Sequence, residues 1–151
     1  MIFGFWLCLA AGPAAAEKRV ALVIGVSGYQ QVPRLPNPVR DAETMTDLFR
    51  KAGFDVVESK RDLGIADLRR AVREFSDTAR DADIAVVYYA GHGIEVDGVN
   101  YLVPADARLA SDFDIEDETI SLDRVLKALD AAKRLSSSSS MPAATTRSRE
   151  P

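Results

Sequence analysis

His92 is the only histidine in the chain, and it stands between two glycines directly after an apolar run, Ile84–Ala90. The run has the length and composition of a buried strand, so His92 is expected at the rim of a sheet, where ligands of open α/β folds bind. The flanking glycines let a substrate or another backbone approach closely. There an imidazole can serve as general base to a Cys or Ser nucleophile, with the Gly93 N–H as an oxyanion donor. Spacing alone leaves both nucleophiles open, and a purely structural histidine is the competing interpretation.

A nucleophile for this histidine is hard to find in the sequence. The one cysteine, Cys8, lies in the apolar stretch Ile2–Gly12, which an Ala14-Ala15-Ala16 segment follows. This is the pattern of a secretory signal peptide cleaved after residue 16, although no Lys or Arg precedes its apolar core. We therefore expect residues 1–16 to be removed and the mature protein to be exported, periplasmic or extracellular, without a stable membrane anchor. An uncleaved anchor or a wrongly assigned start is the alternative. If cleavage occurs, no cysteine remains.

The rest of the chain alternates short apolar runs with amphipathic segments. These segments are separated by glycines, prolines and the Asp97-Gly98 pair, which is typical of a hairpin turn. Asn37 and Ser121 stand where helix N-caps are expected. Strands are expected at 19–25, 54–57, 84–90, 94–96 and 99–103, and helices at 38–52, 65–79 and from 122 onward. This order predicts an α/β sandwich with a mainly parallel sheet.

Composition excludes some classes of function. The chain has 151 residues, enough for one domain, with 19 basic and 23 acidic residues and no basic block, so no nucleic-acid partner is expected. The acidic run Asp112–Glu118 lacks the spacing and central glycine of a calcium loop, so a solvated loop is the favoured interpretation over calcium binding. No other cofactor is expected, and the oligomeric state is open.

Several segments together resemble a known family. Tyr88–Gly93 and Asn100–Asp106 resemble the histidine region of bacterial caspase-like cysteine proteases, of the metacaspase and caspase large-subunit type. Val20–Tyr29 is similar to the first strand of that family, and Leu35–Met45 to its first helix. The resemblance implies a caspase-like three-layer α/β/α sandwich, incomplete at the C-terminus.

The resemblance also implies a function. The protein would be a cysteine-type endopeptidase acting on a peptide or protein substrate, with His92 as catalytic histidine and the Gly93 amide at the oxyanion. Asp41 would match an acidic residue of the pocket for a basic substrate side chain. An Asp in the first turn of a helix also has a simpler explanation, because it favours the helix dipole.

The family pattern breaks after residue 135. The family's cysteine is expected about 50 residues beyond the histidine, which falls near Pro142, just past a run of five serines at 136–140. Codons compatible with this stretch, read in a shifted frame, accommodate an apolar strand followed by Asp-Ala-Cys-Arg. Residues 17–135 are therefore interpreted as a truncated caspase-like domain, and residues 136–151 as a disordered, frameshifted tail. The chain as written is predicted to be inactive; a non-catalytic pseudoprotease that binds peptides or partners, or a hydrolase using Ser27, are the alternatives.

Overall fold

A parallel sheet forms the centre of the computed structural model, which describes residues 17–130 and 132. Its strands are β1 (Arg19–Gly25), β2 (Val56–Arg61) and β3 (Ile84–Ala90), in the order β2-β1-β3. β1 is central and almost wholly buried, because its continuous apolar sequence is covered on both faces. The expected signal peptide (1–16) and tail (136–151) lie outside the described residues.

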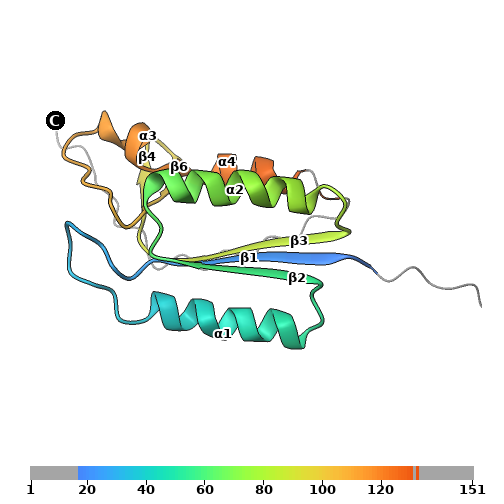
Figure 1. Ribbon diagram of the computed structural model, residues 1–151. Coiled ribbons are helices and arrows are strands. Elements are labelled where there is room, and N and C mark those ends of the chain that lie inside the picture. Colours follow the sequence, from blue (N-terminus) through green and yellow to red (C-terminus); the bar gives the residue numbers. More distant parts are fainter. Residues whose placement is uncertain (1–16, 131, 133–151) are drawn as a thin grey trace, which may run out of the picture.

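Helices cover both faces of this sheet (Figure 1). On one face, α1 (Pro38–Lys51) packs over a cluster that includes Ala21, Val23 and Tyr88. On the other, α2 (Ile65–Ala79) and α4 (Leu122–Leu129) enclose the larger core, with Phe75 and Leu129 fully buried. The expected three-layer α/β/α arrangement is thus confirmed.

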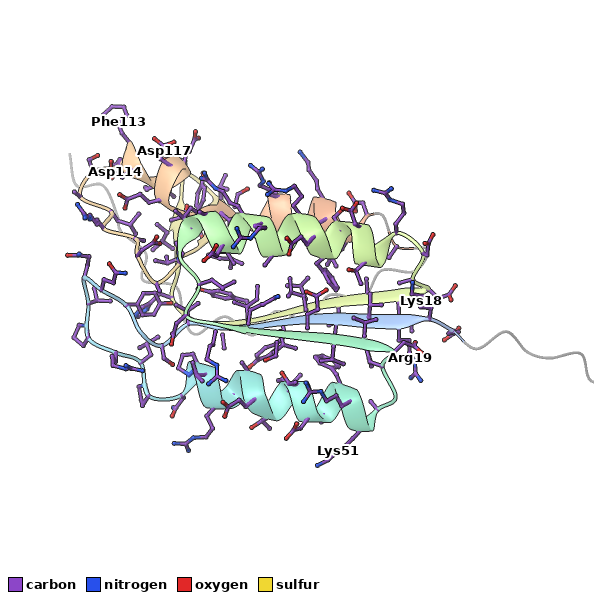
Figure 2. All side chains as sticks on the ribbon, in the orientation of Figure 1. Lys18, Arg19, Lys51, Phe113, Asp114 and Asp117 are labelled. Carbon is purple, nitrogen blue, oxygen red and sulfur yellow. The ribbon has the colours of Figure 1, made fainter. Side chains whose placement is uncertain are left out.

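A small antiparallel sheet follows the parallel one. Its strands are β4 (Gly93–Val96), β5 (Val99–Leu102) and β6 (Ile120–Ser121), in the order β4-β5-β6. The turn between β4 and β5 has positive φ at both Asp97 (51°) and Gly98 (79°), as a type I′ hairpin requires. This sheet lies beyond the carboxyl ends of β1 and β3, at the end of the molecule away from the labelled Lys18 and Arg19 in Figure 2.

Some local expectations were wrong. The second strand begins and ends later than expected, because the polar residues Glu58–Arg61 also pair with β1, at the edge of the sheet. The acidic run contains a short helix, α3 (Asp114–Glu118), and Phe113 at its start points outward and is 93% exposed (Figure 2). Asn37 precedes α1, but its side chain makes no capping bond.

The described residues form neither a membrane-spanning helix nor a cluster of metal ligands. No helix among them is long and apolar enough to cross a membrane. No group of three or more His, Cys, Asp or Glu side chains among them has a geometry suited to a metal ion, the acidic run included.

Candidate active site

His92 lies at the carboxyl end of the parallel sheet, two residues after β3 and directly before β4. The chain after β1 reaches the same place, because the Val26 N–H donates to the Ala90 carbonyl at 2.8 Å. The sequence prediction that His92 stands at the rim of the sheet is therefore confirmed. This end of a parallel sheet is where α/β folds bind ligands.

Two tyrosine hydroxyls hold the main chain of His92. The His92 N–H donates to the Tyr29 hydroxyl at 2.6 Å, and the His92 carbonyl accepts from the Tyr89 hydroxyl at 2.9 Å. The Val103 N–H donates to the same carbonyl at 3.0 Å. The Tyr29 ring also lies against the imidazole, with ring centres 4.6 Å apart and planes tilted by 52°. Both peptide groups at His92 are thus fixed, and the imidazole projects from a rigid base.

Gly91 is the residue that this arrangement requires. A Cβ atom at position 91 would lie 2.5 Å from the Tyr89 hydroxyl and 2.7 Å from the Tyr29 hydroxyl. These separations are far below van der Waals contact, so any side chain there would displace the hydroxyls. The first glycine of the Gly-His-Gly segment therefore serves close packing beneath the histidine.

Burial sets the protonation of all three side chains. Partial burial lowers the pKa of His92 from its ordinary value, so the imidazole is neutral and able to accept a proton at pH 7. Burial raises the pKa of Tyr29, and raises that of Tyr89 well above its ordinary value. Both hydroxyls therefore stay protonated, and the Tyr89 hydroxyl can donate to the His92 and Val103 carbonyls.

The Gly93 N–H points away from the neighbouring strand. Gly93 lies opposite Leu102, and the Val103 N–H donates to the His92 carbonyl beside this pair. That pattern makes Gly93–Leu102 a non-hydrogen-bonded pair of the antiparallel ladder, whose N–H groups point outward from the ladder. The Gly93 N–H, one residue from the imidazole, is therefore not used in the ladder with β5.

Ser27 has a structural role. Its hydroxyl accepts from the Val39 N–H at 3.1 Å, which caps the start of α1 in place of the Asn37 side chain. The Ser27 and Gly28 N–H groups each donate to the Asp62 carboxylate at 2.7 Å. Ser27 is 4% exposed and its oxygen already accepts a hydrogen bond, so this geometry does not favour it as a nucleophile.

Asp41 lies in the first turn of α1, with its side chain exposed. Because Ser27 ties this turn to the end of β1, Asp41 stands at the same end of the sheet as His92. Its side chain is exposed to solvent at that end of the sheet. No cysteine occurs in residues 17–135.

The chain is similar in fold and in sequence to known proteins. Protein GSU0716 from Geobacter sulfurreducens has a similar fold, with a TM-score of 0.58 and 19% identity over 81% of this chain and 50% of that chain. Human mucosa-associated lymphoid tissue lymphoma translocation protein 1 is 40% identical over 92 residues, and its mouse homolog is 38% identical over 96 residues.

Those alignments cover 61% and 64% of this chain, and in each case 11% of the length of the relative. The sequence model of the caspase domain matches residues 18–135, which is most of the chain and contains every element described above. The chain therefore belongs to the caspase domain family.

Proposed function

We propose that this domain is the histidine-bearing part of a caspase-like cysteine endopeptidase. The observation that carries the proposal is the pairing of a neutral, main-chain-anchored His92 with an outward-pointing Gly93 N–H at the carboxyl end of the sheet. An acyl-transfer site needs a base and an oxyanion donor next to each other. The membership of a protease family supports the same reaction class.

In the proposed reaction, His92 takes the proton from a cysteine thiol, and the thiolate attacks the scissile carbonyl carbon. The carbonyl oxygen becomes an oxyanion that accepts from the Gly93 N–H. The imidazolium then gives its proton to the leaving amine as the C–N bond breaks, leaving a thioester. Water hydrolyses the thioester, with His92 again as base.

The sheet topology supports a position for the nucleophile on a further strand beside β3. Among the described residues, β3 pairs with β1 on one side and has no partner strand on its other edge. An apolar hollow of about 190 Å³ lies between this strand and α4, lined by residues such as Val87, Leu102 and Leu126. A right-handed crossover through α4 would bring a following strand to that edge, parallel to β3. The apolar strand of the shifted reading frame would fill the hollow and end its Asp-Ala-Cys-Arg segment beside His92.

The substrate proposed is a peptide with a basic side chain before the scissile bond. Asp41 is the residue proposed to bind that side chain, since its carboxylate is exposed at the same end of the sheet.

We further propose that the protein is exported, on the strength of the N-terminal apolar stretch and its Ala-x-Ala segment.

The test begins with the coding DNA from the codon for Asp130 to beyond the stop. If an inserted or deleted base restores the cysteine frame, the restored protein is expected to cleave peptides with Arg or Lys before the scissile bond. His92→Ala and Cys→Ala should each abolish cleavage, Asp41→Asn should weaken it, and Asp47→Asn, an exposed residue of the same helix, should leave it unchanged. Cleavage by the chain as written would refute the assignment of a cysteine mechanism.

A non-catalytic binding module is the second candidate. It is favoured by the intact anchoring of His92 in a chain whose residues 17–135 contain no cysteine. A binding module should be a soluble monomer with one cooperative unfolding transition, whereas a protease lacking a core strand should aggregate through the open edge of β3. Size-exclusion chromatography and thermal unfolding of the chain as written separate the two.

A further inference from the structure

A second hollow, of about 280 Å³, lies beside the small antiparallel sheet and contains two arginines. Arg69 reaches it from the first half of α2, and Arg124 from the first turn of α4. The hydroxyl-bearing Tyr101 and Ser121 also line it, on the paired strands β5 and β6. Nothing in the proposed peptidase reaction uses these residues.

Arg69 is held in place without a carboxylate. Its Nη2 donates to the carbonyls of Glu116, Asp117 and Thr119, at 2.7, 3.0 and 3.2 Å, which satisfies the carboxyl end of α3. Its Nε is buried and has no hydrogen-bond partner in the described part of the chain. None of the ion pairs found among residues 17–130 involves Arg69 or Arg124.

The charge around the hollow leaves room for one anion. Two guanidinium groups and one carboxylate, that of Glu116, line it, so the balance is one positive charge. Two neighbouring acids of the run Asp112–Glu118 have other partners: the Asp114 side chain accepts from Ser111, and that of Glu118 from the Arg108 and Leu109 N–H groups.

We propose that this hollow binds the carboxylate of an acidic side chain, Glu or Asp, of another polypeptide. Guanidinium groups match a carboxylate in shape and charge, and hydroxyls of the kind that Tyr101 and Ser121 carry complete such a site. Val99 and Ile120 form apolar walls that fit the methylene groups of the side chain. A phosphate dianion fits less well, because Glu116 opposes its second charge. The site is a docking point for an acidic segment, separate from His92 and independent of whether the peptidase reaction occurs.

The test uses the chain as written, isotope-labelled, and follows backbone amide signals while N-acetyl-glutamate amide is added at low salt. Residues 99–101 and 119–124 are expected to shift in a saturable way, while N-acetyl-glutamine amide causes no such shift. Arg124→Gln should weaken binding about tenfold, as the loss of one charge-assisted hydrogen bond predicts. Glu116→Gln should strengthen binding. Arg50→Gln, the same change on the opposite helix layer, should have no effect.

Arg124 is an exposed residue, and its own N–H still bonds to Ser121 after substitution, so this variant is expected to fold. A far-ultraviolet spectrum and a melting curve check that it does. The proposal is overturned if Arg124→Gln and Arg50→Gln bind alike, or if the neutral amide binds as well as the acid. Equal binding of acetate would exclude recognition of a polypeptide side chain, and tighter binding of inorganic phosphate would identify a phosphate site instead.

Discussion

Replacing Tyr29 by Phe should destabilise the protein more than replacing Tyr89 by Phe, although the Tyr89 hydroxyl makes the larger number of short bonds. The Tyr29 hydroxyl is the acceptor of the His92 N–H, at 2.6 Å. Removing it leaves a donor within the fold without its partner, which costs about 1–3 kcal/mol. The single proton of the Tyr89 hydroxyl is shared between two carbonyls, at 2.9 and 2.8 Å. Both carbonyls keep another donor, one from the Val103 N–H and one from the Tyr29 hydroxyl.

The loss in Tyr89→Phe is therefore expected to be only about 0.5–1.5 kcal/mol, the net value of an ordinary hydrogen bond. Both changes keep the aromatic ring, so neither opens a large cavity. Urea unfolding followed by circular dichroism gives the two free energies of unfolding, and equal slopes against urea concentration would show that the comparison is sound. If Tyr89→Phe proved as costly as Tyr29→Phe, the argument from the unpartnered donor would be wrong.

Three further predictions concern the same end of the sheet. In a proton-NMR titration the single imidazole should have a pKa below 6.5. Because the unfolded chain then binds a proton at a higher pH than the folded protein does, the free energy of unfolding should fall as pH falls through 6.5 toward the folded pKa. His92→Gln should remove this pH dependence. Gly91→Ala should cost about 1–3 kcal/mol or prevent folding, through overlap with the two tyrosine hydroxyls; an unchanged melting temperature would contradict the close packing. Ser27→Ala should cost about 1 kcal/mol through the lost cap of α1, and the unaltered chain should not react with a fluorophosphonate; labelling would contradict the structural role of Ser27.

Much of the scaffold could be predicted from periodicity alone. The apolar runs that became β1 and β3 are buried on both faces, and the segments that became α1 and α2 have one apolar side. The Gly-His-Gly position after β3 also indicated where the imidazole lies. These features are local, so neighbouring residues carry the whole signal.

Contacts between distant segments could not be predicted in the same way. Tyr29 and Tyr89 are 60 positions apart, and nothing in their surroundings showed that their hydroxyls meet beneath His92. Ser27 caps a helix that begins 11 residues later, and Asn37, the local candidate, does not. The short β6 exists because β5 offers it a partner, and its two residues have too little sequence to show a period.

The two tyrosine hydroxyls bind only peptide atoms of residue 92, so these hydrogen bonds do not depend on its side chain. Selection for a stable fold therefore preserves the position of this residue whether or not catalysis is being selected. A gene copy without the nucleophile can therefore lose its catalytic chemistry while the backbone around residue 92 keeps its position. The backbone placement that an active site needs is therefore maintained by folding itself, through the contacts of residue 92 with Tyr29, Tyr89 and Val103.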